Sequence, residues 1–175
     1  MNSETKTERF ERTMLPHLDA AHNLARWLAQ NAHDAEDLVQ EACLRAFEYF
    51  DGFRGDSARA WLLTIVRNTC YTWLKRKQPE DLMAEFDEEV HSSANALVTP
   101  EAIFFNEIDN QRLAKALEQL PAEYREVIVL RELEGLSYKE IADVASVPAG
   151  TVMSRLARAR RQLQESLAGT LGKGG

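Results

Sequence analysis

The stretch that decides the fold is SYKEIADVASVPAGTVMSRLARARR, which runs from Ser137 to Arg161. Its first four residues, from Ser137 to Glu140, form a capping box of the kind that opens a helix. We expect this helix to end near Ala145, and a second helix to begin around Pro148. Two short helices joined by about four residues are the pattern of a helix-turn-helix.

Helical spacing divides the second helix of this pair into an apolar face and a cationic face. The apolar face recurs at steps of three and four residues and is expected to pack on the preceding helices: Val152, Leu156, Ala159, Leu163 and Leu167. The opposite face begins with small residues and becomes cationic, with Arg155 and Arg160 at its flanks: Gly150, Thr151, Ser154, Arg158 and Arg161.

This arrangement is suited to the major groove of DNA. Small residues let the backbone come close to a ligand, and the N–H groups at a helix start favour an anion. Arginine binds phosphate or a guanine edge with two parallel hydrogen bonds. The alternative is an amphipathic surface helix with solvated arginines. The capped helix and the short turn before it favour the DNA-binding interpretation over this alternative.

The net charge of −7 comes from a single segment of the 175-residue chain. Residues 78–105 hold seven carboxylates and neither lysine nor arginine. Residues 1–77 hold 11 basic and 11 acidic side chains, and residues 106–175 hold 10 of each. The overall acidity is therefore no argument against nucleic-acid binding. The acidic segment, which also contains prolines and a polar run, predicts a flexible linker between two bodies, and residues 170–175 predict a disordered tail.

Composition excludes several classes of protein. The sequence has no apolar run of about 18 residues and no secretory signal, which predicts a cytoplasmic protein without membrane insertion. Cys43 and Cys70 lie in apolar helical pattern and are interpreted as small buried side chains in a reducing compartment, rather than a redox pair. The four histidines have no metal-ligand spacing. We expect no metal site, no cofactor and no catalytic residues.

Both bodies are predicted to be helical, because spacings of three and four residues recur and period-two alternation is absent. Asp34 is the predicted N-cap of one of these helices, with Asp37 three residues later. The expected helices cover about Arg9 to Gln30, Asp34 to Phe50, Ala58 to Lys77, Pro100 to Leu120 and Ala122 to Leu133.

Two segments of the first body raise questions that spacing alone leaves open. DAEDLVQEACLRAF, residues 34–47, places acids opposite an apolar stripe, either as a solvated face or as a docking surface for a basic partner. WLLTIVRNTCYTWLKRKQ, residues 61–78, mixes aromatic rings with cations, which suits single-stranded or melted nucleic acid. Core aromatics beside a basic helix end are the alternative for this second segment.

Four motifs, in this order, resemble the extracytoplasmic-function group of the sigma-70 family of bacterial sigma factors. They are DAEDLVQEACLRAF, FRGDSARAWLLTIVRNTCYTWLKRK, LPAEYREVIVLRELEGLSYKEIA and VPAGTVMSRLARAR. The resemblance covers about residues 9–168. It implies an all-α fold with two small helical domains, sigma-2 in residues 1–77 and sigma-4, carrying the helix-turn-helix, in residues 106–169.

The resemblance also implies a function. Members of this group bind core RNA polymerase and direct it to promoters, with sigma-2 melting and reading the −10 element and sigma-4 reading the −35 element. The implied partners are promoter DNA, the clamp helices of the largest polymerase subunit, the flap of the second-largest subunit, and an anti-sigma factor. The chain would not be an enzyme.

Site residues follow motif by motif. The implied polymerase-binding residues are Asp34, Glu36, Asp37, Leu38, Gln40 and Glu41. The implied −10 residues are Trp61, Arg67, Asn68, Tyr71, Lys75 and Arg76. The implied −35 residues are Ser137, Tyr138, Lys139, Gly150, Thr151, Ser154, Arg155, Arg158 and Arg161.

Two residues depart from the family pattern. Ser146 stands where the turn of a helix-turn-helix usually carries glycine, so we expect the turn to be slightly remodelled, because serine tolerates a positive φ poorly. Thr72 stands where the family often has aspartate. A stand-alone helix-turn-helix regulator is the main alternative function. A metal-dependent enzyme acting on DNA, with ligands among Asp34, Glu36, Asp37 and Glu41, is a weaker one.

Overall fold

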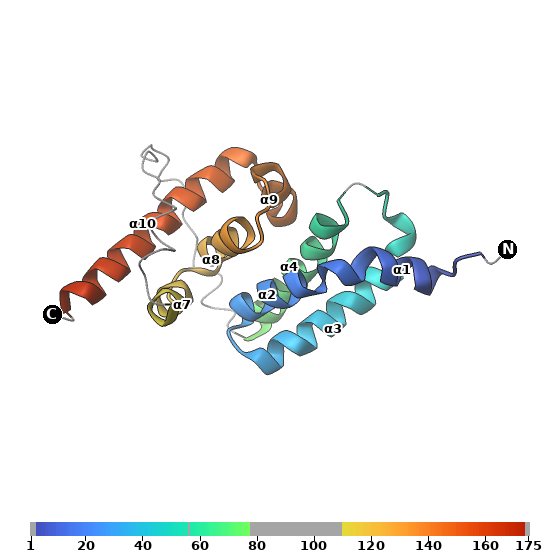
Figure 1. The fold of residues 1–175 in the computed structure, drawn as a ribbon, viewed down its shortest axis with the longest axis horizontal. Helices are drawn as coiled ribbons and strands as arrows, with labels where there is room; N and C mark the ends of the chain where they lie inside the picture. The colour runs from blue at the N-terminus through green and yellow to red at the C-terminus, as the bar shows by residue number, and fades with distance from the viewer. Residues whose placement is uncertain (1–2, 56, 78–109, 174–175) are drawn as a thin grey trace.

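The structure is a computed structural model that describes residues 3–55, 57–77 and 110–173, with the backbone alone for residues 170–173. The predicted linker, residues 78–105, lies outside these described residues. Within them all regular structure is helical, as the all-α prediction requires, and Figure 1 shows the helices gathered into two groups. None of the helices in this described part is long and apolar enough to cross a membrane.

The N-terminal domain consists of four α-helices and two short 3-10 turns. Their bounds are α1 Lys6–Met14, η1 Leu15–His17, α2 Leu18–Ala29, α3 Ala32–Glu48, η2 Phe50–Gly52 and α4 Ala58–Lys77. The predicted bounds of α4 are confirmed. The single helix expected from Arg9 to Gln30 was wrong, because Pro16 falls in its middle. Proline lacks the N–H that a helix interior needs and its ring clashes with the preceding turn, so the chain is redirected at η1.

The N-cap of α3 is not the residue that we predicted. Asn31 has an extended backbone, and its side chain accepts a hydrogen bond of 2.9 Å from the Asp34 N–H. Asn31 is therefore the N-cap, and Asp34 lies in the first turn, where a carboxylate still favours the positive end of the helix dipole. One residue earlier, Gln30 ends α2 in the left-handed conformation, with φ of 59°.

The C-terminal domain contains the predicted helix-turn-helix at its end. Its elements are α7 Asn110–Glu118, α8 Ala122–Ile128, the π-helical turn η3 Val129–Leu133, α9 Tyr138–Ala145 and α10 Ala149–Lys173. The helix expected from Ala122 to Leu133 thus changes to π geometry in its last turn, before Gly135 with φ of 69°. The helix α10 continues to Lys173, four residues into the segment that we expected to be a disordered tail from residue 170.

The turn between α9 and α10 is not remodelled as we expected. Ser146 adopts φ of 59° and ψ of 46°, the left-handed conformation that glycine usually supplies. Its N–H and that of Val147 both reach the Ala142 carbonyl, the latter at 3.1 Å. Pro148 comes next, and its carbonyl accepts hydrogen bonds from Thr151 and from Val152 at 3.0 and 3.2 Å. The proline therefore stands at the start of α10, where its missing N–H costs nothing.

The core extends across both domains. All five residues of the predicted apolar stripe of α10 are buried, none with more than 6% exposure. They belong to one continuous cluster of buried side chains with the cores of the N-terminal helices. The main contacts between the domains join α2 to α8 and η3, and α4 to α9. Because α4 carries the predicted −10 residues, this contact bears directly on the candidate site.

Candidate functional site

The N-terminus of α9 is built by the predicted capping box. The Ser137 hydroxyl accepts from the Glu140 N–H at 3.1 Å, and the Glu140 carboxylate accepts from the Ser137 N–H at 2.9 Å. This backbone hydrogen bond, with the charge of Arg59, lowers the pKa of Glu140. Ser137 and Lys139 are exposed, and Tyr138 is partly buried with the Arg131 guanidinium 4.7 Å from its ring centre. All three predicted residues thus lie at one helix start.

The cationic face of α10 is open along most of its length. Gly150 and Arg161 are exposed, whereas Thr151, Ser154 and Arg158 are partly exposed. The Ser154 hydroxyl donates to the Gly150 carbonyl at 3.2 Å, which keeps this side chain close to the helix surface. The first two turns of α10 therefore present small side chains at Gly150, Thr151 and Ser154, with Met153, which is 54% exposed, beside them.

Arg155 does not share this face. The sequence placed it among the −35 residues, but it is only 8% exposed. Its position on the helix borders the buried stripe through Ala159, and its charge acts on the buried carboxylate of Glu126. Arg155 therefore belongs to the interior of the domain and not to the exposed cationic face.

Arg67 and Tyr71 of α4 point into the contact between the domains. The Arg67 Nε lies 2.5 Å from the Glu126 Oε1, and the Tyr71 hydroxyl donates to the Glu126 Oε2 at 3.2 Å. The Arg67 guanidinium also lies 4.1 Å from the centre of the Tyr71 ring. Glu126 is completely buried, and this burial raises its pKa although Arg67 opposes the shift. Burial, with the charge of Glu126, raises the pKa of Tyr71 well above its usual range.

The other predicted −10 residues are more accessible. Asn68, Lys75 and Arg76 are exposed on α4, as is Thr72, whose hydroxyl donates to the Asn68 carbonyl at 3.0 Å. Trp61 is partly buried, which fits an aromatic side chain shared between core and surface.

Trp61 belongs to a group of aromatic rings at the start of α4. Its ring centre lies 5.1 Å from that of Phe53 and 6.3 Å from that of Phe50. Beside it is an open hollow of about 320 Å³, lined by Gly52, Phe53, Arg54, Ser57, Ala60, Trp61, Thr64 and Asp143. Asp143 comes from α9, so the C-terminal domain forms one edge of the hollow.

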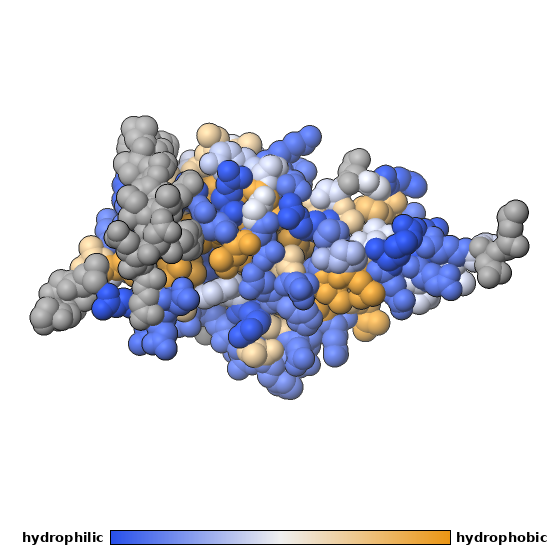
Figure 2. Space-filling model, in the orientation of Figure 1, coloured by the Kyte–Doolittle hydropathy of each residue, from blue (hydrophilic) through white to orange (hydrophobic). Residues whose placement is uncertain are grey.

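The acidic residues of α3 form an exposed face. Glu36, Asp37, Gln40 and Glu41 are exposed and Asp34 is partly exposed, whereas Leu38 is 4% exposed and lies in the core. Leu38 therefore supports this face from beneath and is not on the surface. The sequence interpretation missed Leu44, which is 72% exposed on the same side as Glu41. The available signal was its position on the helical wheel, opposite the buried stripe. Figure 2 shows apolar side chains between α1 and α3 on a largely hydrophilic face of the molecule.

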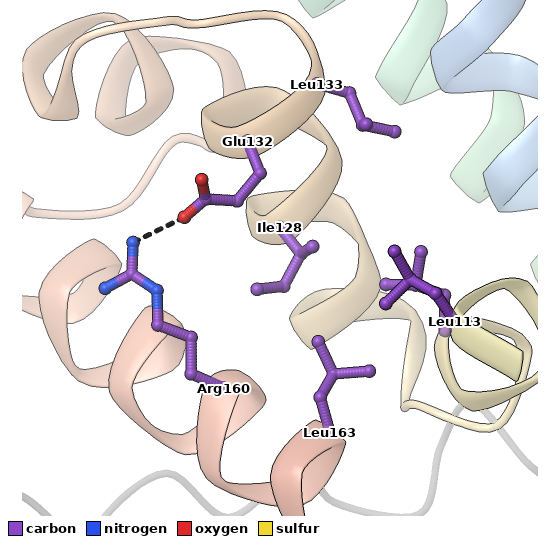
Figure 3. A pocket seen from close by; sticks show the side chains of 7 residues that line it. Leu113, Ile128, Glu132, Leu133, Arg160 and Leu163 are labelled. Atoms are coloured by element: carbon purple, nitrogen blue, oxygen red, sulfur yellow. Dashed lines mark hydrogen bonds and ion pairs between the residues drawn. The ribbon is translucent and has the colours of Figure 1, made fainter. Parts of the chain in front are cut away.

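A shallow apolar groove lies on the C-terminal domain (Figure 3), where side chains from α7, η3 and α10 point toward one another. Its lining residues are Leu113, Leu117, Ile128, Glu132, Leu133, Arg160 and Leu163. The Arg160 guanidinium closes one side through an ion pair of 2.7 Å with Glu132. The enclosed volume is about 10 Å³, roughly one water, which is far too small for an organic ligand.

Neither cysteine has the lowered pKa of a reactive thiol. Burial raises the pKa of Cys70 to about 12 and also raises that of Cys43, so both thiols are poor nucleophiles. In the part of the chain that the structure describes, His, Cys, Asp and Glu side chains form no cluster that could hold a metal ion.

Comparison with known proteins identifies the family. The family model for sigma-70 region 2 matches residues 14–80, and the model for sigma-70 region 4 matches residues 110–163. An ECF RNA polymerase sigma-E factor of Escherichia coli is 39% identical over 141 residues, which are 77% of this chain and 74% of that protein. The ECF RNA polymerase sigma factor SigE of Mycolicibacterium smegmatis is 36% identical over 155 residues, 87% of this chain but only 59% of that protein.

Solved structures give the same result. The sigma factor RpoE of Bartonella quintana, in complex with the anti-sigma factor NepR, superposes with a TM-score of 0.71 at 34% identity, covering 91% of this chain and 97% of that one. CnrH, in complex with the cytosolic domain of CnrY, has a TM-score of 0.64 at 26% identity, covering 91% and 88%. The chain belongs to the extracytoplasmic-function group of the sigma-70 family, a group of DNA-recognition subunits of RNA polymerase and not of enzymes. A stand-alone regulator is not favoured, because region 2 has no place in that alternative.

Proposed function

We propose that this chain binds core RNA polymerase and directs it to promoters, with the N-terminal domain opening and reading the −10 element and the C-terminal domain reading the −35 element. The observation that carries the proposal is the placement of three exposed surfaces on a chain of this family. They are the acidic face of α3, the surface of α4 that carries Asn68, Lys75 and Arg76, and the small and cationic face of α10.

The face of α3 is the proposed docking surface for the clamp helices of the largest polymerase subunit. Asp37, Gln40 and Glu41 supply charge and hydrogen-bonding groups, and the exposed Leu44 supplies an apolar contact among them. An apolar side chain surrounded by polar groups is the usual composition of a protein–protein contact. The Glu41 carboxylate lies 2.8 Å from the Arg45 guanidinium, one helical turn further along α3.

The start of α4 is the proposed site for the −10 element. Unstacking a base from DNA costs a few kcal/mol of free energy, which contacts in a protein pocket must offset. The hollow beside Phe53 and Trp61 provides aromatic surface, and Arg54 provides a cation at its rim. Asn68, Lys75 and Arg76, exposed further along α4, would bind the neighbouring strand through its bases and phosphates.

The start of α10 is the proposed reader of the −35 element as a duplex. Gly150, Thr151 and Ser154 are the proposed small side chains that let the helix enter the major groove, and the partly exposed Arg158 is the proposed contact to a base edge. Ser137 and Lys139, at the exposed start of α9, are placed to contact the phosphate backbone.

Two protein partners besides the clamp complete the proposal. The flap of the second-largest polymerase subunit is one of them, and we assign to it the apolar surface around Leu133, which is 42% exposed. An anti-sigma factor is a further proposed partner, supported by the RpoE complex with NepR. Since polymerase and chromosomal DNA share the bacterial cytoplasm, the proposal places the chain there.

A binding experiment tests the proposed function. Purified chain, core polymerase and a labelled promoter fragment are combined singly and together in a gel-shift assay. We expect a promoter-specific complex only when chain and polymerase are both present. Leu44→Ser should weaken the association with core polymerase severalfold, whereas Leu15→Ser, which changes another exposed leucine on a different surface, should leave it intact. Tight operator binding by the chain alone would instead support a stand-alone regulator.

A further inference from the structure

Met153 is an exposed apolar side chain at the edge of the proposed DNA-binding face of α10. It is 54% exposed, and among the described residues of the C-terminal domain the other large apolar side chain that is exposed is Leu133. Single apolar residues are common on protein surfaces and usually need no explanation. Met153, however, lies on the first turns of a helix whose proposed contacts are small or cationic side chains, so a thioether at this place has a different chemistry to offer.

The neighbours of Met153 on the helix surface are small. Residues three and four positions apart lie side by side on a helix, and for Met153 three of these positions hold Ala149, Gly150 and Ala157. Ala149 and Gly150 are exposed, and Ala157 is partly exposed. Because helical side chains lean toward the N-terminus, the thioether of Met153 lies over the exposed first turn of α10.

The space beside Met153 is not used by the protein itself. A Cβ atom added at Gly150 would meet nothing within 4 Å, and Gly150 has no positive φ that would require glycine. Glycine in a helix is less stable than alanine, so neither packing nor backbone conformation explains it here. The Ser154 hydroxyl donates to the Gly150 carbonyl at 3.2 Å. The surface beside Met153 therefore offers room and apolar contact to a ligand outside the protein.

Met153 and Arg158 border this face on opposite sides. At 3.6 residues per turn they lie about 140° apart around the helix, and at 1.5 Å per residue about 7.5 Å apart along it. Successive base pairs of DNA are about 3.4 Å apart. The two side chains therefore meet different base pairs when α10 lies in the major groove, and Met153 reads a position that Arg158 does not.

The chemistry of methionine matches one group of the major groove. A thioether has no hydrogen-bond donor and is a weak acceptor, and its flexible, polarizable chain packs well against apolar atoms. The base edges in this groove display donors, acceptors and one apolar group, which is the C5-methyl of thymine. A polar base edge against Met153 would lose its hydrogen bonds to water without replacement, whereas a methyl group gains by leaving water.

We propose that Met153 is a specificity-determining residue of the −35 reader, and that it selects thymine at one position by packing against the C5-methyl group. This inference deepens the proposed function and rests on it for the placement of α10 in the major groove. It adds that the −35 element contains an A·T pair whose thymine methyl faces Met153.

The first experiment removes the methyl group from the DNA. Holoenzyme made from the full chain and core polymerase is titrated into a fluorescent promoter duplex in which single thymines of the −35 element are replaced by deoxyuridine, on either strand. This change leaves every hydrogen-bonding group of the base in place. We expect one replacement to weaken binding about fourfold, which is the effect of burying one methyl group. Deoxyuridine between the −35 and −10 elements is the control and should leave binding unchanged.

Two variants show whether Met153 makes the contact. Met153→Ala should weaken binding to the thymine promoter to the level of the deoxyuridine promoter, and it should bind both promoters equally. Thr151→Ser is the matched control, because it removes the other exposed methyl group at the start of α10 and keeps the hydroxyl. Its holoenzyme should still distinguish thymine from deoxyuridine. Parent binding that no deoxyuridine weakens, or a preference for thymine that survives in Met153→Ala, would overturn the proposal.

The second experiment changes the preference itself. Glutamine is close to methionine in length but hydrogen-bonds to base edges, adenine above all. Promoters are selected from a pool with a randomised −35 element by the parent holoenzyme and by that of Met153→Gln. We expect the variant to lose the thymine at one position, with the rest of the −35 element and the transcription start unchanged. The unchanged start also reports that the variant folds and binds polymerase. An identical −35 preference in parent and variant, or a selected element without any A·T pair, would overturn the proposal.

The failure of this inference differs from that of the proposed function. A parent chain that gives no promoter complex with core polymerase would overturn both. A parent holoenzyme that binds its promoter specifically but tolerates every deoxyuridine would overturn the role of Met153 alone.

Discussion

Ser146→Gly is the substitution that tests the description of the helix-turn-helix most sharply. Ser146 is an exposed serine held at φ of 59° and ψ of 46° in the turn before α10. A residue with a Cβ atom in this conformation costs about 1–2 kcal/mol. Glycine removes that strain but loses about 0.5–1 kcal/mol through its greater freedom in the unfolded chain. The net expectation is an increase of about 0.5–1 kcal/mol in the free energy of unfolding.

Urea denaturation followed by far-ultraviolet circular dichroism measures this change, and thermal unfolding gives a second reading. For a chain of this length, an increase of 1 kcal/mol raises the midpoint temperature by about 2–4 °C. Ser154→Gly is the matched control, since it makes the same substitution within the regular helix α10. It should lower the stability by roughly 0.5 kcal/mol. A Ser146→Gly variant that is no more stable than the parent would refute the strained turn.

The remaining predictions concern the α9 cap, the cysteines and the DNA face. Ser137→Ala should lower the free energy of unfolding by about 1 kcal/mol in urea denaturation, because it removes the N-cap of α9. Folding lowers the pKa of Glu140 below its ordinary value of 4.5. The ionised carboxylate therefore stabilises the folded chain fully above pH 4.5, and this stabilisation is lost as the pH falls through the lowered pKa. The free energy of unfolding should therefore fall less steeply below pH 5 in Glu140→Gln than in the parent, and parallel curves would exclude this role. Because burial raises the pKa of Cys70 to about 12, a disulfide reagent at pH 8 should leave this thiol unmodified in the folded chain, and rapid reaction of both cysteines would contradict its burial. Arg158→Ala should weaken promoter binding of the holoenzyme by about 1–3 kcal/mol and relax the −35 preference if it contacts a base, whereas an even loss across sequences would assign it to phosphate.

Local signals in the sequence predicted much of the fold. The capping box from Ser137 to Glu140 and the apolar stripe from Val152 to Leu167 involve residues within one or a few helical turns of each other, so spacing alone reveals them. The bounds of α4 were found for the same reason. Where local signals competed, the prediction was wrong. Asn31 and Asp34 are both good N-caps, and the structure uses Asn31.

The parts that could not be predicted depend on contacts between distant residues. Arg67 and Glu126 are separated by 59 positions, and spacing on either helix gives no sign that they meet. Arg155 looks like another surface arginine on a helical wheel, and only the packing of α8 against α10 shows that it is buried near Glu126. The sequence therefore identified α4 as a candidate DNA site, but not the buried Glu126 carboxylate that binds Arg67 and Tyr71.

Run-off transcription on a randomised promoter pool tests the central claim most directly. Core polymerase is mixed with the pool in the presence and absence of the purified chain, and the transcribed templates are sequenced. We predict transcripts that start at defined positions only when the chain is present, from templates that share two separated elements upstream of the start. Transcripts that are the same with and without the chain, or templates that share no such elements, would contradict its assignment as a promoter-specific sigma factor.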